Sequence, residues 1–315
     1  MPQSLTIYPG RPLRGVIGPA SRYALPGDKS LSHRAALFAA LAEGESRIDN
    51  FLVSGVTEAM LRALTALGVA WRLDGSTLIV HGRGLAGLQS PAAPLDCGNS
   101  ATTLRLLVGA LAAAGIAAEV TGSEGLRRRP MGRVVGPLVQ MGATIESTPE
   151  GTAPLRLSAR QGRLKGIVYQ LPVASAQVKT ALILAALAAD RPTILREPGP
   201  SRDHTERMLR SMGASIESRV EEGSTYVTQV NPGDSWPPAL QPLALRLPCD
   251  ISSAAFLLVA ALVAPGSELT IQDVGLNPTR TGLVEALQRM GADLQVRPGP
   301  DQGGEPSGDL TVRAS

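Results

Sequence analysis

The chain has 315 residues, of which 43% are hydrophobic, 3% aromatic and 18% charged, and its formal net charge is +3. This composition can build a hydrophobic core, which excludes a disordered chain, and the length suits one large domain or two ordinary ones. Two cysteines, Cys97 and Cys249, are too few for a disulfide framework and lack the spacing of a metal site.

The first residues, "MPQSLTIYPGRPLRG", contain no apolar core of the kind that export signals have. The longest charge-free apolar run, residues 106–118, is shorter than the ~18 residues that a membrane span requires. We therefore expect a cytoplasmic protein that has no membrane partner.

A pattern of helices and strands repeats along the chain. Each copy begins with an Ala/Leu-rich helix that has a polar first turn, at residues 27–37, 98–107, 174–184 and 250–260. A strand, a second helix and a hairpin are expected to follow. Each second helix is expected to end at a glycine in the left-handed conformation. These are Gly68, Gly142, Gly213 and Gly291, which lie 74, 71 and 78 residues apart. The alternation predicts an α/β fold.

Residues 82–87, "GRGLAG", match the dinucleotide-binding pattern G-x-G-x-x-G, but we interpret these glycines as turn residues. The pattern binds a pyrophosphate only where its glycines open a helix. Pro91 and Pro94 follow closely and block a helix at this point.

The polar first turns of the repeated helices indicate anion binding, because a helix N-terminus has unpaired N–H groups and a partial positive charge. Capping alone can account for Ser30, Asn99, Ser175 and Ser252. Capping requires neither Lys29 nor Arg34 at the first opening. It does not explain Gln177 and Lys179 at the third. We therefore expect an anion site at these two openings.

The densest basic run is "GLRRRPMGR", residues 125–133, and by itself it is typical of a solvated loop. No aromatic side chain lies between its arginines to stack on bases, so we expect no nucleic-acid partner. A small phosphorylated or carboxylated ligand is the alternative.

Six segments resemble the enolpyruvyl transferases, and specifically the 5-enolpyruvylshikimate-3-phosphate synthases. They are "LPGDKSLSHRAALFAALAEG", "DCGNSATTLRLL", "GLRRRPMGRVVGPLVQMGA", "LPVASAQVKTALILAAL", "SRDHTERMLRSMGA" and "NPTRTGLVEALQRMGA", in the order of the family. The resemblance implies two domains, each an inside-out α/β barrel of βαβαββ units, with the active site in the cleft between them. It places three units, residues 24–240, in one domain and residues 1–23 with 241–315 in the other.

The resemblance also implies a reaction. Phosphoenolpyruvate gives its enolpyruvyl group to the 5-hydroxyl of shikimate 3-phosphate and phosphate is released, a step of chorismate and aromatic amino acid biosynthesis. The family needs no metal or organic cofactor, and we expect a monomer. Both substrates carry phosphate and carboxylate groups, so the site needs fixed cations and N–H donors.

Single residues of the chain match substrate ligands of the family. Lys29 matches a lysine that touches both substrates and is the catalytic candidate. The matches to shikimate 3-phosphate ligands are Lys29, Ser30, Arg34, Ser175, Ala176, Gln177 and Arg202. The matches to phosphoenolpyruvate ligands are Lys29, Asn99, Ala101, Thr102, Arg129 and Gln177. Arg34 lies one helical turn after Ser30, so both can face one opening. The histidines His33, His81 and His204 are interpreted as structural.

The chain departs from the family in its length, because it ends after the fourth of six units. The acid/base carboxylates, a further lysine and further phosphoenolpyruvate arginines of the family belong to the other two. The chain is therefore expected to be either a C-terminally truncated form or part of a longer gene product, and residues 1–315 are expected to have little or no activity by themselves.

Two other functions are considered. UDP-N-acetylglucosamine enolpyruvyl transferase shares the fold, but it typically has Lys-Asn at the first opening and a reactive cysteine in a mobile loop. This chain has Lys29 and Ser30 there, no cysteine in residues 125–131, and a Cys97 that we expect to be a packed thiol. The other alternative is an inactive fragment that binds anions.

Ala101 predicts a difference in ligand selectivity. Many relatives have glycine after "GNS", at a position that borders the phosphoenolpyruvate pocket, where the longer herbicide glyphosate also binds. A methyl group there predicts glyphosate tolerance with ordinary use of phosphoenolpyruvate. Alanine also suits the start of a helix better than glycine does, which is the competing explanation.

Overall fold

The computed structural model describes residues 11–233 and 239–315. The expectation about export signals concerns residues 1–10 in part, and these lie outside the described residues. The chain divides into two compact units. Lys29–Arg246 form one, here called the three-repeat unit, and Leu247–Ser315 with the residues before Lys29 form the other, here called the one-repeat unit.

The three-repeat unit contains three copies of a four-stranded sheet with its helices. The first copy consists of α1 (Lys29–Leu41), β2 (Glu43–Asp49), α2 (Gly55–Ala66), β3 (Ala70–Asp74), β4 (Thr77–Arg83) and, from the end of the unit, β13 (Ala244–Arg246). The second consists of β5 (Leu95–Asp96), α3 (Ala101–Ala114), β6 (Ala118–Thr121), α4 (Glu124–Arg127), α5 (Gly132–Gln140), β7 (Ile145–Glu146) and β8 (Leu155–Leu157). The third consists of β9 (Val168–Gln170), α6 (Ala176–Leu187), β10 (Thr193–Glu197), α7 (His204–Ser211), β11 (Ser215–Glu221) and β12 (Thr225–Asn231). Short 3₁₀ turns lie at Leu85–Gly87 and Glu222–Ser224.

The three sheets have the same topology. Their strand orders are β13-β2-β4-β3, β5-β6-β8-β7 and β9-β10-β12-β11. In each, the first two strands are parallel and the other pairs antiparallel. A parallel pair needs a crossover connection, which α3 and α6 provide in the second and third copies. In the first copy the parallel partner of β2 is β13, so the unit extends to Arg246, six residues beyond the expected boundary at 240.

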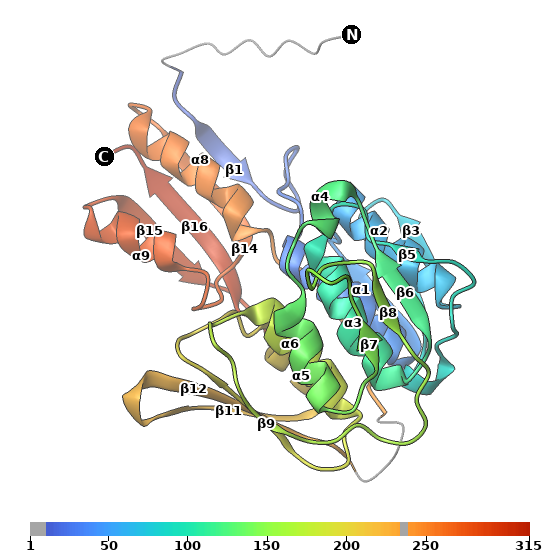
Figure 1. Cartoon of the computed structure of the whole chain (residues 1–315). Coiled ribbons are helices and arrows are strands. Elements are labelled where there is room, and N and C mark those ends of the chain that lie inside the picture. Colours follow the sequence, from blue (N-terminus) through green and yellow to red (C-terminus); the bar gives the residue numbers. More distant parts are fainter. Residues whose placement is uncertain (1–10, 234–238) are drawn as a thin grey trace. The chain divides into compact units, whose positions relative to one another are not determined.

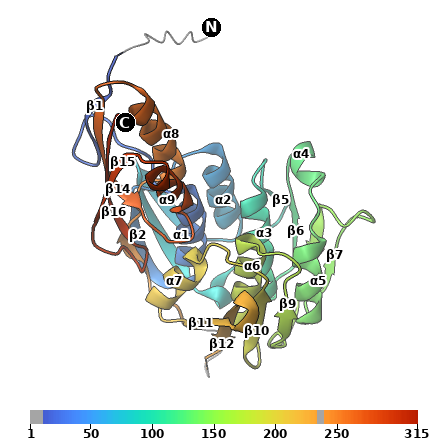
Figure 2. The same ribbon diagram turned by 90° about the vertical axis from the view of Figure 1, so that its left-hand side faces the viewer.

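Helices α1, α3 and α6 form the core of the three-repeat unit. They are rich in alanine and leucine on nearly every side, and a helix without a polar face must be surrounded by protein. Helices α3 and α6 approach closely at Gly109, where an added Cβ would lie 2.5 Å from the Cα of Ala181. The strands lie outside these helices in both views (Figure 1 and Figure 2). The expected inside-out arrangement of βαβαββ units is therefore confirmed.

The glycines that end the second helices are also as predicted. Gly68, Gly142, Gly213 and Gly291 have φ values of 83°, 96°, 92° and 94°. The interpretation of Gly82 as a turn residue is wrong, because it lies within β4. A Cβ at Gly82 would overlap the carbonyl oxygens of Ala39 and Ala42, so glycine is required where this strand meets the end of α1.

The one-repeat unit is a fourth copy of the same pattern, assembled from the two ends of the described chain. It consists of β1 (Arg14–Ile17), α8 (Ile251–Val263), β14 (Glu268–Gly275), α9 (Gly282–Arg289), β15 (Asp293–Pro298) and β16 (Ser307–Arg313). Its sheet order is β1-β14-β16-β15, with β1 parallel to β14. Helices α8 and α9 share one hydrophobic core with this sheet (Figure 1).

A buried ion cluster fixes the segment that ends at Asp28 within the one-repeat unit. The carboxylate of Asp28 lies 3.0 Å from Arg280 Nη1, and Arg280 Nη2 lies 3.3 Å from Asp250 Oδ1. The N–H of Asp28 donates to the carbonyl of Pro248 at 2.9 Å. These contacts explain why the first change of unit follows Asp28, five residues after the expected boundary at 23. In the part of the chain described here, no helix is both long and apolar enough to cross a bilayer.

Candidate functional site

A pocket of about 200 Å³ lies in the three-repeat unit, beside the first turns of three core helices. Its lining residues are Lys29, His33, Val56, Asn99, Ser100, Ala101, Thr102, Arg105, Arg129 and Gln177. The six residues that the resemblance assigns to phosphoenolpyruvate are all in this set. They come from α1, the turn before α3, α3 itself, the segment between α4 and α5, and α6.

The N-terminus of α3 forms one wall of the pocket, and Ser100 holds it in place. Ser100 Oγ accepts hydrogen bonds from the N–H of Thr103 at 3.1 Å and from its hydroxyl at 2.8 Å. The expectation that Asn99 caps this helix is therefore wrong. The exposed Asn99 side chain accepts a hydrogen bond from the Ser123 hydroxyl at 3.3 Å.

His33 supports this wall as a neutral, buried side chain. Its Nδ1 lies 2.8 Å from the carbonyl oxygen of Lys29, which can only accept, so Nδ1 carries the proton. Its Nε2, 3.2 Å from Ser100 Oγ, therefore accepts from the Ser100 hydroxyl. Burial is the main cause that lowers the pKa of His33 below its usual value, which keeps the ring uncharged at neutral pH.

Gln177, in the first turn of α6, links two other pocket residues. Its Nε2 donates to the Thr102 hydroxyl at 2.8 Å, and its Oε1 accepts from Arg105 Nη1 at 2.6 Å. Arg105 Nη2 also donates to the carbonyl of Pro130 at 3.4 Å, next to Arg129. Both ends of the Gln177 amide are therefore oriented by partners within the site.

The pocket is electropositive. Its ten lining residues include the cations Lys29, Arg105 and Arg129 and no carboxylate. Burial is the main cause that lowers the pKa of Arg105, and the neighbouring charges of Arg133 and Arg129 lower it further. Arg105 is not among the residues that the sequence predicts for this site. Its spacing could have identified it, because it lies one helical turn after Ala101, on the same face of α3.

The residues expected to bind shikimate 3-phosphate are only partly brought together. Ser30, the second residue of α1 and therefore not its cap, accepts a hydrogen bond from Arg202 Nη1 at 3.3 Å. Ser175 occupies the N-cap position of α6, but its side chain makes no capping hydrogen bond. Ala176 and Gln177 follow it as the first residues of that helix. At the fourth opening, Asp250 rather than Ser252 caps α8.

Arg34 lies one turn after Ser30 in α1, and its guanidinium is hydrogen-bonded to neighbouring helices. Its side chain is buried, with 2% of the residue exposed. Its Nε donates to the Thr205 hydroxyl at 2.8 Å and its Nη2 to the Thr180 hydroxyl at 2.9 Å. Its Nη1 donates to the carbonyl of Ser30 at 3.0 Å. The guanidinium therefore joins α1 to α6 and α7, and it acts on Ser30 by holding the backbone.

Lys179 is not part of an anion site at the start of α6. Its Nζ lies 2.7 Å from Glu197 Oε2 and 2.8 Å from Glu206 Oε1, and all three residues are buried. Burial disfavours the ammonium, but Glu206 and Glu197 together outweigh it and raise the pKa of Lys179. The ammonium group of Lys179 therefore forms ion pairs with two buried carboxylates.

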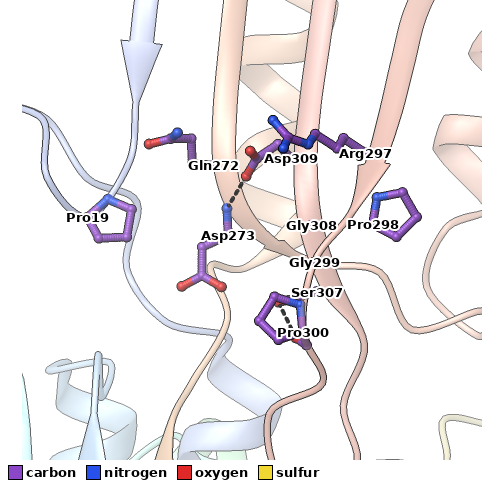
Figure 3. A pocket seen from close by; sticks show the side chains of 10 residues that line it. All are labelled: Pro19, Gln272, Asp273, Arg297, Pro298, Gly299, Pro300, Ser307, Gly308 and Asp309. Carbon is purple, nitrogen blue, oxygen red and sulfur yellow. Dashed lines mark hydrogen bonds between the residues drawn. The ribbon is translucent and has the colours of Figure 1, made fainter.

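The one-repeat unit has a pocket of its own, of about 510 Å³, between the N-terminal segment and the sheet (Figure 3). Asp273, Asp309 and Arg297 line it, and the Asp273 N–H donates to Asp309 Oδ1 at 3.1 Å. Its lining contains none of the residues that the sequence analysis selected. Two carboxylates beside one arginine do not favour an anion, so this pocket is not the candidate site.

Cys97 is a packed thiol, as expected. It is fully buried, and burial together with the charge of Asp96 raises the pKa of this thiol to about 12. A thiol that stays protonated is a poor nucleophile.

The comparisons with known proteins agree with this geometry. The family EPSP synthase (3-phosphoshikimate 1-carboxyvinyltransferase) matches residues 19–313. The 3-phosphoshikimate 1-carboxyvinyltransferase of Alkalilimnicola ehrlichii is 48% identical over 98% of this chain, and that of Citrifermentans bemidjiense is 45% identical over 99%. The EPSP synthase structure from Acinetobacter baumannii is 41% identical and superposes on 98% of the chain with a TM-score of 0.87. The chain spans 66%, 69% and 66% of the length of these three proteins. It belongs to the EPSP synthase family.

Proposed function

We propose that this protein carries the phosphoenolpyruvate pocket of an enzyme that transfers the enolpyruvyl group of phosphoenolpyruvate to the 5-hydroxyl of shikimate 3-phosphate and releases phosphate. The observation that supports this most directly is the pocket that Lys29, Arg105 and Arg129 share with the N-terminus of α3. Its volume of about 200 Å³ is below the range typical of drug-sized ligands and suits a compact anion.

The pocket residues have distinct roles in this proposal. The planar fork of Arg129 suits the phosphate or the carboxylate of phosphoenolpyruvate, which a lysine would bind only as a point charge. Lys29 contacts both substrates and takes part in proton transfer. Asn99, Ala101 and Thr102 form the wall against phosphoenolpyruvate. As the tetrahedral adduct loses phosphate, negative charge gathers on the leaving group, and fixed cations stabilise it.

Shikimate 3-phosphate lies on the other side of Lys29 in this proposal. Ser30 and Arg202, which are in contact, and the segment from Ser175 to Gln177 supply its ligands. Gln177 reaches both substrates, and its hydrogen bonds to Thr102 and Arg105 support this double role. Arg34 is a further ligand in this proposal, and its hydrogen bond to the Ser30 carbonyl also holds the backbone of that residue.

The alternative acceptor, UDP-N-acetylglucosamine, is not favoured. The UDP-N-acetylglucosamine enzyme relies on a reactive cysteine, whereas Cys97 is buried and its raised pKa keeps it protonated. A monomer that acts in the cytoplasm on two small-molecule substrates is part of the same proposal. Light scattering of the purified protein tests the oligomeric state.

Two lysines of the chain provide a test of the proposed substrate site and its control. Lys29 and Lys165 are both exposed, but only Lys29 lines the pocket. We expect Lys29→Ala to weaken the binding of both substrates at least about tenfold, the loss of one charge-assisted contact, and Lys165→Ala to change neither. Titration calorimetry measures both dissociation constants, and thermal melts check that each variant is folded. Unchanged binding by folded Lys29→Ala would contradict the assignment.

The transfer step itself has a separate readout. Phosphate release that depends on both substrates demonstrates turnover. Binding of shikimate 3-phosphate without phosphate release indicates instead a protein that binds this anion but does not convert it.

A further inference from the structure

A buried carboxylate lies directly behind the segments proposed to bind shikimate 3-phosphate. Glu197 is the last residue of β10, and 1% of it is exposed. Its Oε1 accepts the N–H of Ser175 at 2.9 Å. Its Oε2 accepts the hydroxyl of Ser201 at 2.9 Å and lies 2.7 Å from Lys179 Nζ. The two oxygens of this carboxylate therefore accept hydrogen bonds from two separate segments of the chain.

Those two segments carry the candidate ligands. Ser175 begins the run that continues into Gln177, and Ser201 immediately precedes Arg202, which donates to Ser30. Ser175 is the N-cap of α6, where its carbonyl accepts the N–H of Lys179 at 2.9 Å, and Ser201 lies in the loop between β10 and α7. The contacts of Glu197 hold the two segments at a constant separation.

Lys179 and Glu206 complete the buried cluster, and Glu206 has other partners than Glu197 has. Glu206 Oε1 lies 2.8 Å from Lys179 Nζ and accepts the hydroxyl of Thr228 in β12 at 3.4 Å. Glu206 Oε2 is buried without a hydrogen-bond partner. Glu197 and Glu206 are thus equally buried and share one lysine, but only Glu197 contacts Ser175 and Ser201.

We propose that Glu197 is a positioning residue for shikimate 3-phosphate, which sets the distance between the Ser175 segment and the Ser201–Arg202 loop. The inference rests on the proposed function, which names the ligand. A carboxylate is needed because it accepts at both oxygens, whereas a glutamine has one accepting oxygen and would turn its NH₂ group toward one of the donors. Lys179 offsets the cost of burying this charge.

The test compares Glu197→Gln with Glu206→Gln. Each variant removes one buried carboxylate and leaves Lys179 paired with the other, so the change in charge is the same. We expect Glu197→Gln to weaken shikimate 3-phosphate binding about tenfold, as the loss of a charge-assisted hydrogen bond does, and Glu206→Gln to leave it unchanged. Calorimetry measures the binding, and thermal melts measure the stability of each variant.

A second measurement needs no ligand. Hydrogen exchange followed by mass spectrometry should show faster exchange in peptides that cover Ser175 and Ser201 in Glu197→Gln, and no such change in Glu206→Gln. Ser201→Ala removes a single hydroxyl and keeps the proposal testable if Glu197→Gln does not fold. We expect it to weaken shikimate 3-phosphate binding about threefold, the effect of one neutral hydrogen bond.

The outcomes separate the inference from the function on which it rests. Equal binding by Glu197→Gln, Ser201→Ala and the parent would overturn the inference. So would an equal loss in Glu197→Gln and Glu206→Gln, because the cluster would then act through stability alone. A parent protein that binds no shikimate 3-phosphate would overturn the proposed function, and with it the ligand named here.

Discussion

Replacing Ala101 by glycine tests whether one methyl group decides which anion the pocket accepts. Ala101 is the first residue of α3, lines the pocket and is only 5% exposed. Hydrogen bonds of the preceding residue hold the backbone at Ala101 in place. The preceding Ser100 bonds to Thr103 and, 3.2 Å away, to His33 of α1. A ligand longer than phosphoenolpyruvate must therefore bend or press against the methyl group.

The size of the effect follows from the cost of overpacking. A surplus methyl group in a closely packed site costs about 1–3 kcal/mol, which corresponds to a factor of about 5–150 in affinity. We expect Ala101→Gly to tighten glyphosate binding by such a factor and to leave phosphoenolpyruvate binding unchanged. Glycine also costs up to about 1 kcal/mol in a helix, so the melting temperature should fall by about 2–4 °C.

Calorimetric titration of glyphosate into protein saturated with shikimate 3-phosphate, and of phosphoenolpyruvate into protein without it, measures both effects. Ala110→Gly, farther along α3 and outside the pocket, is the control, since it lowers helix stability without touching the ligand. Equal glyphosate constants for the parent and Ala101→Gly would refute the steric reasoning. Ala101 would then act only as a helix former.

Three further predictions concern single positions in the three-repeat unit. Lys179→Met should cost about 3–5 kcal/mol of stability, because it strands two buried carboxylates. The pKa of Lys179 is raised, so its contribution is complete below its unfolded value of 10.5 and is lost as the pH rises through the higher folded value. Thermal melts should therefore show a constant difference from the parent at neutral pH that closes only in strong alkali. Cys97 should resist thiol reagents at about pH 8 until the protein unfolds, since its pKa is about 12; rapid labelling of the native protein would contradict this. Gly82→Ala should give little folded protein, because the new Cβ overlaps the backbone of α1, whereas Gly132→Ala, with nothing within 4 Å, should melt like the parent.

The sequence alone was sufficient to predict the elements and their repetition, because these depend on near neighbours along the chain. An alanine- and leucine-rich run with a polar first turn predicts a buried helix, and α1, α3 and α6 follow this rule. Helix α8 also forms where it is predicted, but only one side of it is buried, and Phe256 is 79% exposed. The glycines after the second helices are equally local signals. Gly68 and Gly213, for example, adopt the left-handed conformation that their position after a helix predicts.

The direction of the polar side chains was decided only by tertiary structure. Arg34 and Lys179 are cations near helix N-termini, where the sequence predicts anion sites. Arg34 turns to hydroxyls of α6 and α7, and Lys179 turns to carboxylates 18 and 27 residues farther along the chain. A buried charge lies where its partners are, and those partners come from other elements.

Long-range pairing also decided the limits of the units and the composition of the site. β13 belongs with β2 because Ala244 pairs with Arg47, a partner that no local pattern at residue 240 indicates. Arg105 joined the site because its guanidinium reaches Gln177 of another repeat. Local sequence determines which residues form a helix, whereas the packing of one helix against another determines which charges share a pocket.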